Sequence, residues 1–454
     1  MKLYKTYIEN RVYDDKFLQS KSVLLICSLF LILSAHEVFT STLTFILLDS
    51  VLAIYLTSLF RSKYKYLFLI HPIFLLFSSY GFEIPFADIG VGFHYTDTFE
   101  YLVEPHLHNQ TSIYEYCEEQ ESIFGFCKVY WGIIPIIGLP FFLYNHILEM
   151  TLYYSMGFFN MLFVSIAVYI SQFFHILNKK TLLVIALFST VSPTFFEINT
   201  TLHRYGLLFF GLFLFLLSYI GLIKQKKSIF NKTLLVFILF VSIMSIGFSK
   251  PQLFVVLLLF VFLDQVSSNN IPIISKIYNS FDKRVLLCLL IFAIQATAFL
   301  VIPSSYAPAV SDYGNYKAIN DIPLIGFVVR VIYAMLSPFP WFNFSQLDIY
   351  GGNSLFLIVR IFSAFFSSWL IFSTFFKFNL IMKSFDTDKT IIIFGIAIMF
   401  SLMFSAIGYN VYLAPALPFL AVILLKKSYR IHIIYPIAFI LSMEILAHIA
   451  RAIR

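Results

Sequence analysis

Long apolar runs recur along almost the whole chain and constrain its fold more than any other feature. The first reaches from Ser22 to Phe82 with few interruptions. The 454 residues are 60% hydrophobic and 12% charged, whereas a soluble domain usually carries about 25% charged residues. A helix of roughly 20 mostly apolar residues is long enough to cross a bilayer. The sequence therefore predicts an all-α polytopic membrane protein, with residues 1–454 forming a single transmembrane domain.

About thirteen apolar stretches are predicted to cross the membrane as helices. The N-terminus is basic, and no small-residue cleavage site follows the first apolar run. We therefore expect an uncleaved first span and not a removed signal peptide. The predicted spans are 22–37, 42–60, 66–82, 153–176, 181–198, 205–223, 233–248, 251–267, 285–302, 354–376, 390–408, 411–425 and 431–449.

Two further apolar stretches are interrupted by prolines. WGIIPIIGLPFFLYNHIL (131–148) contains two prolines, and LIGFVVRVIYAMLSPFPWF (324–342) contains two more. Proline breaks the helical hydrogen-bond ladder, and backbone freed at membrane depth must be satisfied by protein or water. We therefore predict that both stretches are outer-surface or re-entrant helices.

Basic residues orient the predicted spans, because Lys and Arg concentrate in cytoplasmic loops. With the N-terminus in the cytoplasm, most of the 31 Lys and Arg residues fall in inside loops. If 131–148 also crossed, Lys179, Lys180 and the lysines of 224–232 would lie outside, so 131–148 is placed on the outer face. The net charge of +7 thus reflects membrane orientation, and nucleic acid is not an expected partner.

Two external regions follow from this topology. Residues 83–148 form an acidic loop and the first outer helix, and residues 303–353 form a loop that carries the second. The part 83–130 contains nine acidic residues and one basic residue, Lys128. Cys117 and Cys127 also lie there. An oxidising compartment would permit a disulfide between them, and two free thiols are the alternative.

Four cations depart from the inside pattern and share an outer setting. Arg204, beside His203, lies in NTTLHRYG, and Lys250 lies in GFSKPQ, each at a predicted outer turn. Arg330 lies in the second outer helix, and Arg360 lies near the outer end of its span. Charged groups near membrane depth are costly and tend to face a polar cavity or a partner. Snorkelling of each cation to the outer headgroups is the alternative.

Acidic and basic side chains are thus expected at one outer rim. Arg matches phosphate geometry with a bidentate fork, Lys supplies a point charge, and a carboxylate acts as a general base. This combination predicts a water-filled outer cavity that binds an anionic lipid-linked substrate. A solvated acidic surface loop is the alternative for HYTDTFEYLVEPH (94–106). No P-loop, GxGxxG, HExxH, GxSxG or CxxC motif occurs, so ATP coupling is not expected.

Three isolated acids lie in or near predicted spans. They are Asp49, Asp264 and Glu444. We interpret them as structural pairs or interface residues, and the sequence assigns none of them a role.

In the order of these features, the chain resembles the multi-spanning glycosyltransferases of the GT-C superfamily. The acidic loop matches at TDTFEYL, with Asp97 and Tyr101. The outer helix and next span match in GLPFFLYNHILEMTLYYSMGFFNMLFVSIAVYI, and the later turns match in SPTFFEINTTLHRYG, FSKPQLFVVLLL and GYNVYLAPALPFL. RVIYAMLSPFPW is similar to membrane proteins of bacterial surface-polysaccharide clusters, including Wzy-type O-antigen polymerases. Extra spans before the acidic loop depart from typical GT-C members.

The resemblance implies sugar transfer from a polyprenyl-phosphate or diphosphate donor, on the periplasmic face of a bacterial inner membrane. Asp97 would be the general base that activates the acceptor hydroxyl. If their stretch is helical, Glu100 and Glu104 share a face with Asp97, where they would bind sugar hydroxyls or assist a divalent metal. The implied partners are membrane lipid, polyprenyl-linked sugar and other polysaccharide-assembly proteins. Further substrate-binding candidates are Tyr101, His203, Arg204, Lys250, Arg330 and Arg360, of which Arg204, Lys250 and Arg330 would neutralise the leaving phosphate.

Two other functions compete with single-sugar transfer. A Wzy-type polymerase would join undecaprenyl-diphosphate-linked repeat units and would depend on arginines that grip the diphosphate. A lipid-linked oligosaccharide flippase would need charged residues along a path through both leaflets. The concentration of cations at the outer rim argues against the flippase.

Overall fold

The computed structural model describes eight stretches of the chain and a few single positions. Every regular element in them is a helix, which confirms the predicted all-α fold class. The chain divides into two compact units. Unit 1 contains Met1–Val191 and Ile198–Ser249, and unit 2 contains Ser192–Glu197 and Lys250–Arg454. The described residues are 42–81, 149–195, 205–225, 228–249, 253–268, 354–383, 387–400 and 413–452, with positions 282, 328, 331–332 and 335–336.

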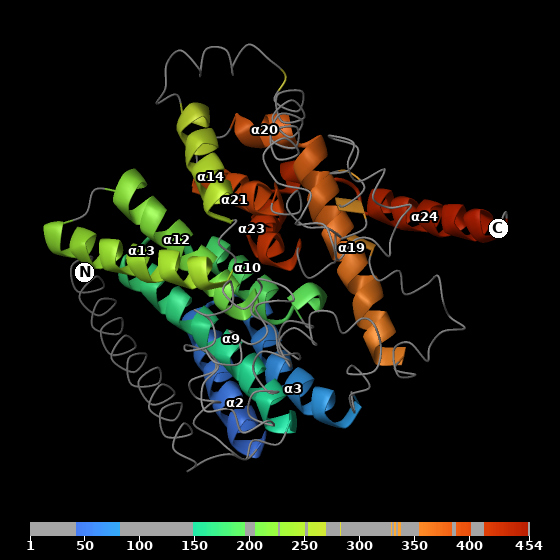
Figure 1. Cartoon of the computed structure of the whole chain (residues 1–454), viewed down its shortest axis with the longest axis horizontal. Coiled ribbons are helices and arrows are strands. Elements are labelled where there is room, and N and C mark those ends of the chain that lie inside the picture. Colours follow the sequence, from blue (N-terminus) through green and yellow to red (C-terminus); the bar gives the residue numbers. More distant parts are fainter. Residues whose placement is uncertain are drawn as a thin grey trace, which may run out of the picture. The chain divides into compact units, whose positions relative to one another are not determined.

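Unit 1 is a helical bundle in which α9 lies against α2, α10 and α12, and α12 lies against α13 (Figure 1). Helix α2 also packs on η1 and α3. Its described elements are α2 (Thr42–Leu59), the 3-10 helix η1 (Lys63–Leu69), α3 (Ile70–Gly81), α9 (Glu149–Phe173), α10 (Lys179–Thr190), α12 (Tyr205–Tyr219), the π-helix η3 (Ile220–Lys224) and α13 (Ile229–Ser249).

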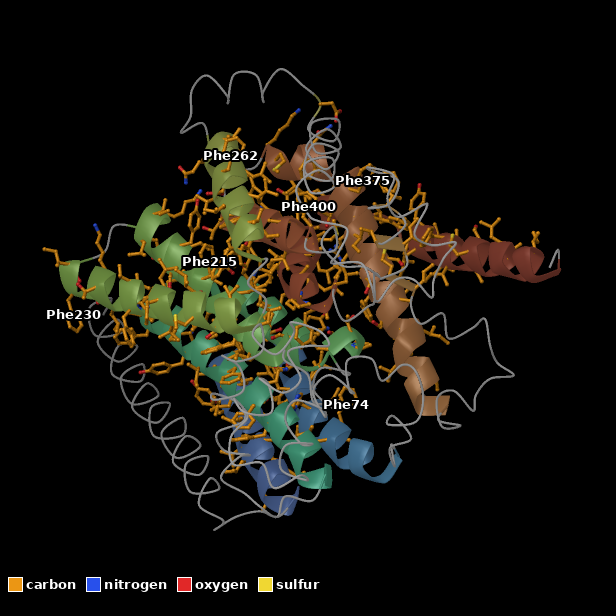
Figure 2. The ribbon with its side chains drawn as sticks, viewed as in Figure 1. Phe74, Phe215, Phe230, Phe262, Phe375 and Phe400 are labelled. Carbon is orange, nitrogen blue, oxygen red and sulfur yellow. The ribbon has the colours of Figure 1, made fainter. Side chains whose placement is uncertain are left out.

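Helix α12 occupies the interior of unit 1. Its sequence, YGLLFFGLFLFLLSY, is apolar on every face, and a helix of that kind is buried. Helix α13 differs, because it buries one face on α12 and exposes the other. Figure 2 shows the contrast between Phe215, buried in α12, and Phe230, exposed at the start of α13. A helix with exposed apolar side chains suits contact with lipid better than contact with water.

Unit 2 packs α21 between α14 and α23, and packs α19 on α23, η9 and α24. Phe394 of α21 contacts Phe260 and Phe419 edge-on, with ring centroids 4.9 and 5.0 Å away. The described elements are α14 (Leu253–Ser267), α19 (Ser354–Phe376), α20 (Phe378–Met382), α21 (Thr387–Met399), η8 (Ala414–Ala416), α23 (Leu417–Leu420), η9 (Ala421–Leu425), η10 (Lys427–Tyr429) and α24 (Ile434–Ala452).

Three predicted spans differ from the helices observed. The span 181–198 is interrupted, because α10 ends at Thr190, three residues before Pro193. The span 411–425 is divided into η8, α23 and η9, each near Pro415 or Pro418. Proline has no N–H to donate, so the ladder of i to i−4 bonds stops there. The span 66–82 begins as the 3-10 helix η1 and becomes α-helical only at Ile70.

Two described helices, Gly206–Lys224 and Ile229–Gly247, are long and apolar enough to cross a membrane. They support membrane association, and shorter apolar helices accompany them at 46–59, 157–173, 253–267, 361–376 and 414–425. The count of thirteen spans, the inner membrane and the cytoplasmic N-terminus stay predictions. The predicted spans 22–37 and 285–302 and the outer helix 131–148 lie outside the described residues, as does most of 324–342.

Close packing of α12 on α13 yields a test of the fold. A Cβ on Gly211 would lie 3.0 Å from Ser245 Cβ and 3.3 Å from the backbone nitrogen of Ile246, whereas a Cβ on Gly206 would meet nothing nearer than 3.7 Å. Both Gly→Ala changes gain similar helix propensity. Gly211→Ala should therefore be less stable than Gly206→Ala by about 1 kcal/mol, from overpacking. Thermal unfolding in detergent measures the difference, and equal midpoints would contradict the observed packing.

Candidate functional site

One of the residues predicted for the outer site, Arg360, lies in a described helix. It belongs to α19, one turn before Ser363, and its side chain is not described. The others lie outside the described residues, and their roles stay predictions. They are Asp97, Glu100, Tyr101, Glu104, His203, Arg204, Lys250, Arg330, and the disulfide candidates Cys117 and Cys127.

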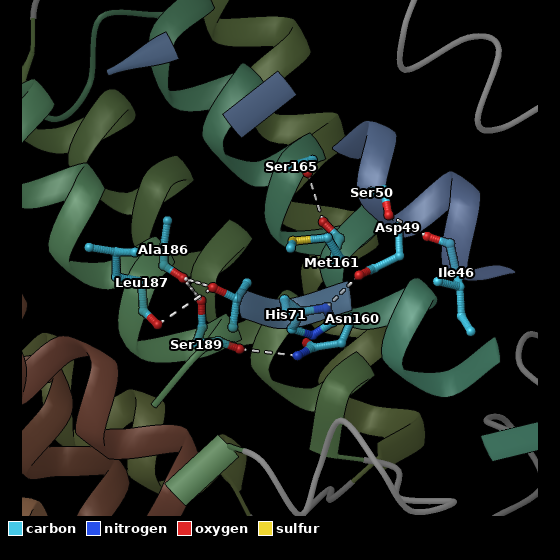
Figure 3. A network of polar contacts seen from close by, with 11 residues as sticks. Ile46, Asp49, Ser50, His71, Asn160, Met161, Ser165, Ala186, Leu187 and Ser189 are labelled. Atoms are coloured by element: carbon cyan, nitrogen blue, oxygen red, sulfur yellow. Dashed lines mark hydrogen bonds and ion pairs between the residues drawn. The ribbon is translucent and has the colours of Figure 1, made fainter. Parts of the chain in front are cut away.

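Unit 1 contains a buried pair of an acid and an imidazole. Nδ1 of His71 in α3 lies 2.8 Å from Oδ2 of Asp49 in α2, and both side chains are fully buried (Figure 3). Asp49 lies ten residues before Leu59, the last residue of α2, which places it about 15 Å from that helix end. The hydrocarbon core of a bilayer is about 30 Å thick, so the pair lies near mid-depth if α2 crosses.

The pair is fully buried, and a charged group without a partner in apolar surroundings would be costly. Oδ1 of Asp49 and Nε2 of His71 are buried and have no hydrogen-bond partner among the residues that the structure describes. The evident effect of the pair is to hold α2 against α3.

Asn160 in α9 satisfies a carbonyl that a proline leaves free. Its Nδ2 donates to the backbone oxygen of Ser189 in α10 over 3.1 Å (Figure 3). In a continuous helix this oxygen would accept from the N–H of residue 193, but residue 193 is proline. Asn160 also touches α12, since a Cβ on Gly206 would lie 3.7 Å from its Oδ1. One buried side chain therefore contacts both the end of α10 and the start of α12.

The Ser-Pro of SPTFFEINTTLHRYG restarts the helix after this break. The N–H of Phe195 donates to both the side-chain and backbone oxygens of Ser192, and Pro193 suits the first helical position because it needs no N–H there. Within unit 2, Oγ of Ser363 donates to Oγ1 of Thr194 over 3.1 Å. The structure thus brings the Ser-Pro segment against α19, the helix that contains Arg360.

Unit 2 contains a second buried polar group, which gives Asp264 a partner. Oγ1 of Thr390 in α21 donates to Oδ1 of Asp264 in α14 over 2.9 Å. Nζ of the adjacent Lys389, also buried, donates to the backbone oxygen of Ser267 over 3.0 Å. A cation at the C-terminal carbonyls of a helix is favourable. This group joins α14 to α21 and includes none of the residues predicted for the outer rim.

His71 and Asn160 escaped the sequence analysis, and Asp49 had no assigned partner. The available signal was a polar residue inside an apolar run, as in FLIHPIF and GFFNMLF. In the described parts of the chain, no group of three or more His, Cys, Asp or Glu residues could hold a metal ion. The question of a metal at Glu100 and Glu104 lies outside those parts.

Comparison of the chain with family models, with curated proteins and with solved structures gave no match. The resemblance to GT-C glycosyltransferases and to Wzy-type polymerases therefore rests on the sequence features alone.

Removing one member of the Asp49–His71 pair tests its role. His71→Leu leaves a buried carboxyl without its imidazole and should cost about 3–5 kcal/mol. Asp49→Asn should cost less, because a neutral amide still donates to Nδ1 of His71. The double variant Asp49→Leu/His71→Leu should be more stable than His71→Leu alone, since no polar group then stays buried without a partner. Unfolding midpoints in detergent measure this cycle, and additive losses would rule out coupling.

Proposed function

We propose that the chain is a membrane glycosyltransferase of surface-polysaccharide biosynthesis, such as that of O-antigen. It transfers a sugar from a polyprenyl-phosphate-linked donor on the periplasmic face of a bacterial inner membrane. The observation that carries the proposal is a charge pattern in the sequence. The one long acidic loop, 83–130, is placed on the same side as the few cations that depart from the positive-inside pattern.

Each charged residue has a chemical task in this proposal. The Asp97 carboxylate accepts the proton of the acceptor hydroxyl as the new C–O bond forms at the anomeric carbon. The bond from that carbon to the phosphate oxygen breaks, and the polyprenyl phosphate leaves with the electron pair. Arg204, Lys250 and Arg330 stabilise the negative charge on the leaving group, and one well-placed donor typically contributes roughly 3 kcal/mol.

The break at the end of α10 supports a recessed outer cavity. Helix α10 has 12 residues and is therefore about 18 Å long, which is shorter than the hydrocarbon core of roughly 30 Å. If Lys179 and Lys180 lie at the cytoplasmic surface as predicted, the helix breaks within the membrane. Irregular backbone at that depth is tolerated where it is buried in protein or lines a water-filled cavity. A charged donor phosphate needs such a cavity.

A Wzy-type polymerase is the second candidate, favoured by the stretch RVIYAMLSPFPW with Arg330. Its donor would be an undecaprenyl-diphosphate-linked repeat unit, and the cations would hold the diphosphate. Single-sugar transfer needs a carboxylate base, whereas the polymerase depends on the cations. Asp97 would then be dispensable.

Substitution of Asp97 and Arg204 tests the proposal. Asp97→Asn removes the base and should lower transfer by about 10²–10⁴-fold. Arg204→Ala removes a charge from the leaving group and should also lower transfer strongly. Each variant is expressed in cells that lack the native gene, and the sugar chains of the lipopolysaccharide are analysed by gel and mass spectrometry. Protein level in the membrane is measured alongside.

Matched controls come from the same external loop. Glu115→Gln removes an acid that the proposal does not use, and Lys128→Ala removes an unassigned outer cation, so both should leave the sugar chains unchanged.

The sugar chains made by the Asp97→Asn and Arg204→Ala variants distinguish the candidate functions. Loss of one side-branch sugar would identify a single-sugar transferase, and single-repeat chains would identify a polymerase. Substrate accumulating on the inner leaflet would identify a flippase. Normal chains in both Asp97→Asn and Arg204→Ala, at normal protein level, would contradict the proposed site.

A further inference from the structure

Two basic segments of unit 1 lie at helix ends. The first, 175–180, connects α9 to the first residues of α10 and has the sequence HILNKK. The second, 224–232, runs from the end of η3 into the first turn of α13 and has the sequence KQKKSIFNK, of which 226 and 227 lie outside the described residues. Neither segment contains an acidic residue, and the charge pattern predicts that both are cytoplasmic.

The side chain of Gln225 joins the two segments. Its Nε2 donates to the backbone oxygens of His175 and Ile176, each over 3.2 Å. Ile176 also lies close to η3, because a Cβ on Gly221 would come within 3.5 Å of its Cδ1. Lysines from two separate helix connections are therefore held at the same end of the unit 1 bundle.

The backbone turn at His175 makes this contact possible. His175 follows the end of α9 and has a φ of 49°, in the left-handed region that commonly ends a helix. Its N–H donates to the Gln172 oxygen, and the N–H of Ile176 donates to the Ser171 oxygen, which is the usual bonding of such a helix end. The turn leaves the carbonyls of His175 and Ile176 to accept from Gln225.

The joined surface combines positive charge with exposed apolar side chains. Lys179 and Lys180 lie in the first turn of α10, where a cation opposes the positive end of the helix dipole, so a bound anion would offset both. Between the lysines of the second segment, Ile229 and Phe230 are 85% and 75% exposed (Figure 2). The basic side chains of the surface are all exposed, and they are His175, Lys179, Lys180, Lys224 and Lys232.

This combination selects among anionic partners. Nucleic acid or an acidic soluble protein would match the charge and leave Ile229 and Phe230 in water. An anionic lipid matches both features, because its phosphate meets the lysines and its acyl chains meet the apolar side chains.

We propose that this basic surface, made of 175–180 and 224–232, binds the phosphate headgroups of anionic lipids in the cytoplasmic leaflet, and that Gln225 holds the two segments in one binding geometry. The surface is distinct from the outer site of the proposed function, and lipid binding there does not depend on sugar transfer.

Lipid binding is measured on the full-length protein in a non-ionic detergent, as the shift of the unfolding temperature with added lipid. Dioleoylphosphatidylglycerol should raise the midpoint with increasing concentration, and dioleoylphosphatidylcholine, which has the same acyl chains and no net charge, should not. The shift should shrink as salt rises, because the lysines are exposed. Glycerol phosphate has the charge without the acyl chains and should have little effect. An equal shift with glycerol phosphate, or with phosphatidylcholine, would overturn the proposal.

A double variant, Lys180→Ala/Lys232→Ala, removes one exposed lysine from each segment. It should weaken phosphatidylglycerol binding by roughly 30-fold, because one lysine at an anionic membrane surface contributes about 5-fold. The matched control is Lys383→Ala/Lys427→Ala, which removes two exposed lysines of unit 2 that are also predicted to be cytoplasmic. It should leave the affinity nearly unchanged. An equal loss in both double variants would show an effect of net charge alone and would overturn the proposed surface.

Gln225→Met tests the joining of the segments without a change of charge. It keeps an unbranched side chain and removes both bonds to the 175–176 backbone, so phosphatidylglycerol should bind severalfold more weakly although every lysine stays. Ser228→Ala is the control from the same segment, because it removes the oxygen that accepts from the N–H of Asn231 in the first turn of α13 and leaves Gln225 in place. It should lower the unfolding temperature without lipid and leave the lipid affinity unchanged. Equal affinities in Gln225→Met and the wild type would overturn the role of Gln225, and normal binding by the double lysine variant would overturn the surface itself.

Discussion

Backbone hydrogen bonding in apolar surroundings is the constraint on which the rest of this structure depends. In a bilayer, each N–H and C=O must find a partner within the protein, and a continuous helix satisfies nearly all of them. Pro193 creates an exception, which Asn160 resolves by donating to the Ser189 carbonyl. Ser242 of α13 likewise donates to the Gly211 carbonyl of α12 over 2.9 Å. Polar residues in the apolar runs thus join helices by way of the backbone.

Buried ionisable side chains also need hydrogen-bond partners, and leaving one without a partner costs more free energy than it does for a neutral group. Asp49 bonds to His71 in unit 1, and Asp264 bonds to Thr390 in unit 2. Each acid meets a polar group from another helix, because a carboxylate alone in an apolar interior would be far more expensive than a paired one. Such pairs specify which helices pack together, whereas the abundant Phe and Leu contacts tolerate many alternative packings.

The break at Ser192–Pro193 connects the fold to the proposed chemistry. The sequence places a polar, cationic turn after it, and Thr194 bonds to Ser363 of α19 within unit 2. A transferase that uses a lipid-linked donor must present fixed charges to a phosphate while its remaining surface stays apolar. Helices that end early, with their free carbonyls satisfied by side chains, meet both needs.

The sequence by itself determined the all-α class, because apolar runs of this length and frequency satisfy their backbone as helices. It also indicated the approximate ends of α2, α13 and α19, where apolar residues begin and end. The tertiary structure alone decided which buried polar groups meet, including the amide of Asn160 that donates to the Ser189 carbonyl at the end of α10. His71 lies 22 residues from Asp49, and Thr390 lies 126 from Asp264. Such pairing depends on how helices pack in space, and the hydrophobic pattern of one segment contains no information about its neighbour's register.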